Sequence, residues 1–180
     1  MRALRVVEAA VRALGRAVAW LCAALVGCQA VAVCLRYVFG VGAIGLQEAV
    51  IYCHALLFLC GAAYVLQLDG HVRVDIVYGR LRGRARRAVD LVGLALFVIP
   101  TAAVIGTSSW SYVARAWASL EGSRQAGGLP AIYLLKSAIL VFAVALVLQA
   151  LATIARIVTG TASDAWTGGD PDTPRPETPR

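Results

Sequence analysis

Among the ionisable side chains within or beside the long apolar runs of this sequence, four are considered for chemistry: Arg36, Glu48, His54 and Lys136. An ionisable side chain is costly in hydrocarbon, so each is a candidate for ion pairing, ion transport or cofactor binding. Glu48 and Lys136 stand a few residues inside their runs, and Arg36 directly follows one. Since none of these three reaches the centre of a bilayer, we expect Glu48 to pair with Arg36 or Lys136 and hold helices together, in preference to carrying an ion.

Histidine ligation of a haem iron is the second chemistry to consider. The chain has two histidines, His54 and His71. On one helix their separation would amount to about 25 Å, so the two cannot bind the same iron. We therefore expect no haem, and we expect His54 to be hydrogen-bonded inside a helix bundle.

The remaining reactive residue types do not form a site. The five cysteines all lie in apolar runs without CxxC spacing, which predicts neither a disulfide nor a metal site. The sequence also lacks a Ser/His/Asp set, a Gly-rich phosphate loop and paired carboxylates deep in a run. We therefore expect no enzyme, no metal and no cofactor.

The elements that position these residues are four apolar segments. With 60% hydrophobic and 15% charged residues, the composition is that of an integral membrane protein and not of a soluble domain. The first segment is too long for the core of a signal peptide, so we expect it to be uncleaved. Pro100 is expected to kink the third. The sequence predicts an all-α membrane protein with four transmembrane helices at about 17–35, 45–67, 88–110 and 133–157, which together form the transmembrane domain 17–157.

The basic residues predict the orientation of these helices. The net charge is +7, but the arginines sit at the ends of apolar segments and not on one continuous face, which argues against nucleic-acid binding. Residues 1–16 hold four basic residues, residues 68–87 six and residues 156–180 three, whereas the other two loops hold three together. By the positive-inside rule, both termini are cytoplasmic.

Two segments outside the predicted helices have patterns of their own. Leu68–Arg87 places Val74, Val77, Tyr78 and Leu81 at helical spacing, with arginines opposite. This pattern predicts a basic interfacial segment between helices 2 and 3 that offers its arginines to anionic lipid head groups. Residues 158–180 are rich in proline and polar residues, so we expect a disordered cytoplasmic tail.

Several short motifs, taken in order, resemble the small membrane subunit of tripartite ATP-independent periplasmic (TRAP) transporters. These are Arg36-Tyr37-Val38-Phe39 at the end of the first span, Glu48 at the start of the second, His71–Asp75 after it, and Trp117–Ser123 with Gly127–Pro130 in the third loop. The resemblance extends over roughly residues 12–157.

The resemblance implies a multi-pass protein of the bacterial inner membrane with two partners. These are a large membrane subunit, which carries the substrate and sodium sites, and a soluble periplasmic substrate-binding protein. The small subunit would brace the large one during sodium-coupled uptake of an organic acid. Leu46-Gln47 stands where many relatives have a Trp and a second acid, and this variant resembles the branch linked to 2-oxo acids and other carboxylates.

The residues expected to contact a subunit or lipid are Arg36, Glu48, His71, Arg73, Asp75 and Lys136. His71, Arg73 and Asp75 lie just after the second span, where they could cap its last carbonyls, pair with a partner or serve only to orient the chain. Two other functions stay open. A stand-alone four-span exporter would be expected to have a central glutamate in its first span, and a membrane assembly or regulatory factor would leave no clear mark in the sequence.

Overall fold

The computed structural model describes residues 2–68 and 83–159. Its described elements are α1 (Arg2–Val38), α2 (Ile44–Gln67), α4 (Gly83–Val92), η1 (Gly93–Val98), α5 (Ile99–Ala118) and α6 (Ile132–Thr159). Four helical stretches are long and apolar enough to cross a membrane: Leu4–Val38, Ile44–Gln67, Arg84–Ala118 and Ile132–Thr159. The predicted all-α fold with four membrane-spanning helices is confirmed.

The helices extend beyond the predicted spans at the N-terminal side of the first and at both ends of the third, which runs to Ala118. Alanine and arginine are both good helix formers, so α1 runs without a break from Arg2 through the basic segment before residue 17. It ends at Val38, where Gly40 adopts a φ of +68°. The third long helix begins at Gly83, so the last residues of the predicted interfacial segment form its first turn. Residues 69–82 and 160–180, which hold the rest of that segment and nearly all of the predicted tail, lie outside the described residues.

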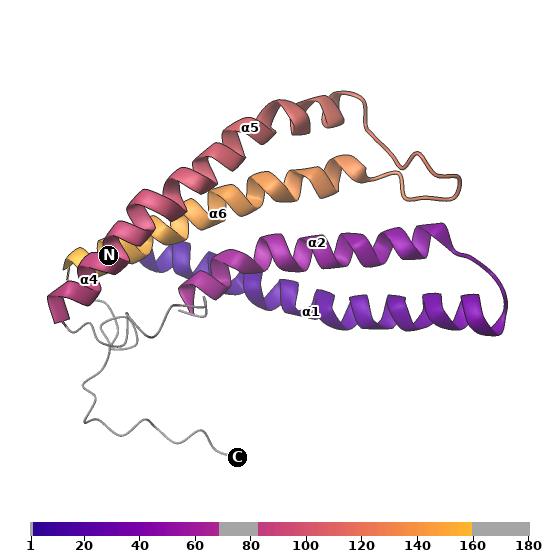
Figure 1. Ribbon diagram of the computed structural model, residues 1–180, viewed down its shortest axis with the longest axis horizontal. Helices are drawn as coiled ribbons and strands as arrows, with labels where there is room; N and C mark the ends of the chain where they lie inside the picture. The colour runs from indigo at the N-terminus through magenta and orange to yellow at the C-terminus, as the bar shows by residue number, and fades with distance from the viewer. Residues whose placement is uncertain (1, 69–82, 160–180) are drawn as a thin grey trace, which may run out of the picture.

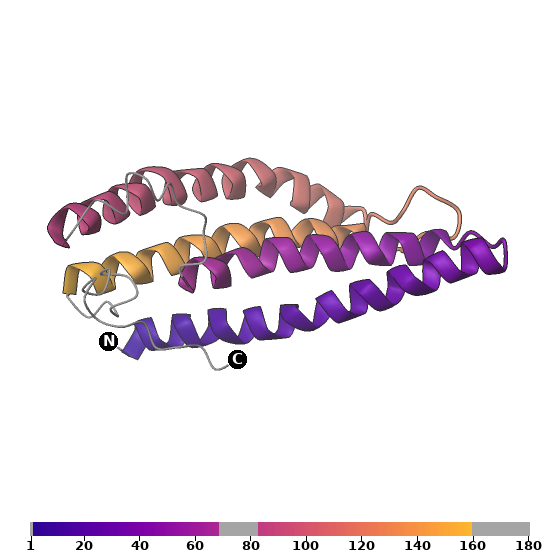
Figure 2. The same cartoon turned by 60° about the horizontal axis from the view of Figure 1, so that its bottom comes forward.

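The helices lie side by side in the order α1, α2, α6, α5, as two antiparallel hairpins (Figure 1). α2 packs against α1 on one side and α6 on the other, and α6 packs against α5. α5 forms one edge of the arrangement and α1 the other (Figure 2), although at the N-terminal end α1 passes behind α2 and also contacts α6 (Figure 1). We call the end that holds the start of α1 and the end of α6 the N-terminal end, and the opposite end the loop end.

Few side chains are buried between the helices. One cluster joins α2, η1 and α6 through Leu66, Leu94, Ala150 and Ile157. A second joins α1, α2 and α6 through Val18, Cys60 and Ala138. Many large apolar side chains instead face outward, as expected where lipid takes the place of water.

The third long helix stays continuous past Pro100. Proline has no N–H to donate, so the regular α-helical bond to the carbonyl four residues earlier is lost. The turn just before it is π-helical, and the N–H of Ile99 reaches the carbonyl of Leu94. The chain accommodates Pro100 through this wider turn and follows a gentle arch as far as Ala118 (Figure 2).

Candidate functional site

The loop between α5 and α6, residues 119–131, is held against the start of α2 by Glu48. The carboxylate accepts a hydrogen bond from the backbone N–H of Leu129 at 2.6 Å and another from the hydroxyl of Ser123, one at each oxygen. Hydrogen bonds to a charged acceptor are roughly twice as strong as neutral ones. Glu48 lies on α2 and is part-buried, and its two hydrogen bonds fasten the loop to that helix.

The loop is shaped to present those two donors together. The Ser123 N–H donates to the Leu129 carbonyl at 3.0 Å, and the Gln125 N–H donates to the Ser123 hydroxyl at 3.1 Å. Gly128 lies beside this pair, where an added Cβ would come within 2.8 Å of Glu48 Oε1. Only glycine leaves room for the carboxylate at this point. We call Glu48 with Ser123, Gly128 and Leu129 the Glu48 clasp.

A second group of contacts fastens the base of the same loop between α5 and α6. Lys136 pairs with Glu121 at 2.5 Å, and its Nζ lies 3.9 Å from the centre of the Tyr112 ring. The Trp117 indole N–H donates to the Ser137 hydroxyl at 2.7 Å, and its ring meets Tyr133 edge to face at 4.8 Å. These aromatic and charged contacts tie the last turns of α5 to the first turns of α6.

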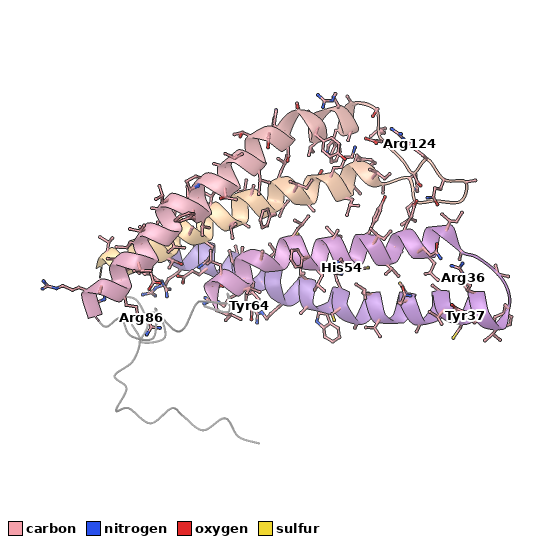
Figure 3. The ribbon with its side chains drawn as sticks, in the orientation of Figure 1. Arg36, Tyr37, His54, Tyr64, Arg86 and Arg124 are labelled. Atoms are coloured by element: carbon pink, nitrogen blue, oxygen red, sulfur yellow. The ribbon has the colours of Figure 1, made fainter. Side chains whose placement is uncertain are left out.

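The predicted partners of Glu48 are therefore wrong. Lys136 is taken by Glu121, because its position on α6 turns it toward α5 and the base of the loop. Arg36 is exposed on the last turn of α1, near the end of the first hairpin (Figure 3). Within the described residues no ion pair joins Arg36 to Glu48, and the carboxylate oxygens bind the two loop donors instead. Sequence reasoning found the right residue and missed its partners.

At the N-terminal end an ion pair joins two residues that no sequence motif singled out. Arg156 on α6 pairs with Glu8 on α1, whose residue exposure is only 3%. Gln67, the last residue of α2, donates from its side-chain amide to the Glu8 carbonyl at 3.2 Å. Three helices thus meet at Glu8. The one available signal was that Glu8 is the single acid of α1.

His54 is exposed on α2 and lies near Phe58, with ring centroids 6.4 Å apart. The prediction of a hydrogen-bonded histidine inside the bundle is wrong, because α2 turns other faces toward α1 and α6. Within residues 2–68 and 83–159 no three His, Cys, Asp or Glu residues gather as metal ligands would. All five cysteines are free and lie on α1 and α2. His71, Arg73 and Asp75 lie outside the described residues, and their roles stay predictions.

The structure brings Glu48 together with the two stretches of the third loop that carried the resemblance, 117–123 and 127–130. The sequence model of one family matches residues 25–160, described as tripartite ATP-independent periplasmic transporters, DctQ component. Comparisons with curated proteins and with solved structures find no match. The matched range includes most of the four helices and the whole Glu48 clasp. The chain therefore belongs to the DctQ component family of tripartite ATP-independent periplasmic transporters.

Proposed function

We propose that this chain acts as a scaffold within its transporter, bracing the large permease subunit while that subunit carries out sodium-coupled uptake of an organic acid. Family membership makes the chain a component of a tripartite transporter. The bracing role, the sodium coupling and the substrate class are proposals. The exposed outer face of α1 carries the argument.

That face of α1 is suited to close contact with another helix. Ala23, Gly27, Ala30 and Cys34 recur at helical spacing and are all exposed. A Cβ added at Gly27 would meet no atom within 4 Å. Small residues let transmembrane helices approach each other closely, and only 6% of the most apolar window of α1 is buried within the chain. The face is therefore open to a helix of the large subunit.

The charged side chains of the two ends support a static role. Glu48 holds a loop, Lys136 pairs with Glu121, and Glu8 pairs with Arg156. Each of these groups ties two elements together, whereas coupling an ion would need a charged group free to bind it. The grooves on either side of α6 are lined almost wholly by apolar side chains. These features favour a brace over a stand-alone carrier.

The other parts of the proposal follow from the sequence. We propose from the positive-inside pattern that both termini are cytoplasmic, and from the family that the multi-pass chain lies in the bacterial inner membrane. A periplasmic binding protein delivers the substrate, which the Leu46-Gln47 variant suggests is a 2-oxo acid or another carboxylate. Arg36 is exposed and available to a partner, whereas Glu48 and Lys136 act within the chain. His71, Arg73 and Asp75 are proposed to contact the large subunit or lipid head groups.

Reconstitution tests the scaffold role directly. In liposomes with a sodium gradient, the chain alone should take up no organic acid, and uptake should require the large subunit and the binding protein as well. Robust sodium-driven flux by the chain alone would contradict the proposal and favour a stand-alone transporter. Normal uptake by the other two components without this chain would instead favour an assembly or regulatory factor.

Co-purification with a tagged large subunit tests the α1 face. Gly27→Leu should weaken recovery of the complex at least fivefold, because a larger side chain keeps the helices apart. Gly93→Leu is the matched control on the third helix, since a Cβ there also meets nothing within 4 Å. Equal recovery of both variants would show that this face is not the contact.

Asp75→Asn tests the proposed contact of His71–Asp75, because it leaves the arginine pattern of this segment intact. Unchanged assembly and uptake in that variant would mean that the segment serves only to orient the chain.

A further inference from the structure

A groove of about 400 Å³ runs between α1 and α2 near the N-terminal end. At one point the helices touch tightly, because a Cβ added to Gly15 would overlap the ring of Tyr64. Tyr64 lies on α2 close to where α1 passes it (Figure 3). Farther along, Gly61 leaves open space, and a Cβ there would meet no atom within 4 Å. We call this space, bordered by Val18, Ala19 and Phe58, the α1–α2 groove.

Two arginines of α1 stand close in sequence to Gly15, which lines one end of this groove. Arg12 and Arg16 lie one helical turn apart on α1, on either side of Gly15 in the sequence, and both are exposed. Glu8 is one turn from Arg12, but it is buried and pairs with Arg156. Among the described residues, neither Arg12 nor Arg16 has an acidic partner. The two guanidinium groups are therefore available to an external anion.

The charged and apolar parts follow one another along α1, which is long and apolar enough to cross a membrane. The groove follows α2 from Val65 to Leu57, a length of about 12 Å at 1.5 Å per residue. Half of a bilayer's hydrocarbon core is about 15 Å thick. The arginines lie at the end of the groove nearest Gln67, where α2 ends. Positive charge at the membrane surface, continuous with an apolar groove inside it, matches the shape of a phospholipid.

We propose that the α1–α2 groove binds one anionic phospholipid, with its phosphate between Arg12 and Arg16 and an acyl chain packed against Gly61. Arginine binds phosphate oxygens through paired N–H donors, and each basic residue near a membrane surface strengthens anionic lipid binding roughly fivefold. A soluble phosphate compound would use the arginines alone and leave the groove empty. The site belongs to the chain itself and is independent of its orientation and of the bracing role.

Native mass spectrometry of the full chain in detergent, mixed with equal amounts of dioleoyl phosphatidylglycerol and dioleoyl phosphatidylcholine, tests the site. The unmodified chain should retain one phosphatidylglycerol in preference to phosphatidylcholine. Arg12→Gln with Arg16→Gln should weaken phosphatidylglycerol binding by about thirtyfold, from two lost charges. Gly61→Leu should fill the groove and weaken binding of both lipids at least tenfold. The open space at Gly61 means that this substitution need not disturb the fold.

Matched controls separate the site from general effects of charge and size. Arg115→Gln with Arg124→Gln removes two exposed arginines from the loop end, and Gly27→Leu enlarges another glycine with open space around it. Both should bind lipid like the unmodified chain, and thermal unfolding followed by circular dichroism should show that every variant is folded.

Four outcomes would overturn the proposal. The first is undiminished preference for phosphatidylglycerol after the Arg12 and Arg16 substitutions. The second is undiminished binding by folded Gly61→Leu, and the third is displacement of the lipid by an equal amount of glycerol phosphate. The fourth is no lipid preference in the unmodified chain; loss of the large subunit in the arginine variant would then make this surface a protein contact.

Discussion

The backbone N–H of Leu129 donates a hydrogen bond of 2.6 Å to the carboxylate of Glu48, although the two residues lie 81 positions apart in the chain. Ser123 donates to the other oxygen of the same carboxylate. Because hydrogen bonds to charged groups contribute about 1.5–3 kcal/mol each, the position of the loop depends strongly on this one side chain. The Glu48 clasp also joins the two hairpins at the loop end.

Glu48→Gln should release the loop, because a neutral amide cannot accept both donors at the former carboxylate oxygens. Loss of about 2 kcal/mol would raise the open population of the loop by roughly thirtyfold. Arg124 is exposed in this loop (Figure 3), so cleavage by trypsin after Arg124 measures that opening. Gln47→Ala, at the exposed neighbouring position, is the control and should leave the rate unchanged. An unaltered rate in Glu48→Gln would mean that the clasp does not hold the loop.

Gly128→Ala should open the same loop for a steric reason. Its methyl group would approach Ser123 and come within 2.8 Å of Glu48 Oε1, so the clasp could close only after the backbone shifts. We expect faster cleavage after Arg124, similar to that in Glu48→Gln. Gly42→Ala, in the other loop at this end, is the control, since its Cβ would meet nothing within 4 Å. If trypsin cleaves Gly128→Ala and Gly42→Ala after Arg124 at the same rate, the packing at Gly128 is not as close as the structure indicates.

The four membrane-spanning helices could be predicted from the sequence, whereas the way they pack against one another could not. Hydropathy alone reveals a helix long enough to cross a membrane, and the four spans followed from it. α2 is apolar on every side, so its sequence does not distinguish the face toward lipid from the faces toward α1 and α6. For this reason His54 was expected inside the bundle although it is exposed.

The partners of the charged residues were hidden for a different reason. Glu48 binds a backbone N–H and a serine, and neither has a charge that would single it out in the sequence. The motif resemblance did mark Glu48 and the third loop, but as separate segments. Glu8 and Arg156 are 148 positions apart, and Arg156 stands where an orienting basic residue is expected anyway. Only the packing of α1 against α6 shows that they form a pair.

Reporter fusions test the proposed orientation. Fusions after Arg87 and after Ile157 should report a cytoplasmic location, and a fusion near Ser123 should report a periplasmic one, because the basic residues cluster at the N-terminal end. A fusion after Gly42, in the other loop at the loop end, should agree with the one near Ser123. A periplasmic signal after Arg87 or Ile157 would reverse or break the proposed topology.

Arg156→Gln should destabilise the chain more than any exposed arginine substitution, because it leaves the buried carboxylate of Glu8 without its partner. Breaking one side of a buried ion pair costs about 3 kcal/mol, which corresponds to a fall in melting temperature of roughly 6–12 °C for a chain of this size. Thermal unfolding in detergent, followed by circular dichroism, measures the fall.

Adding Glu8→Gln to Arg156→Gln should restore most of the lost stability, since two neutral groups can share a hydrogen bond and no charge stays buried. Arg5→Gln is the matched control on α1, where the side chain is exposed, and it should shift the midpoint by no more than about 2 °C. If the double variant melts as low as Arg156→Gln, the loss comes from packing at Arg156 and not from an unpaired charge. If Arg156→Gln melts like the unmodified chain, the junction of α1, α2 and α6 does not depend on the ion pair.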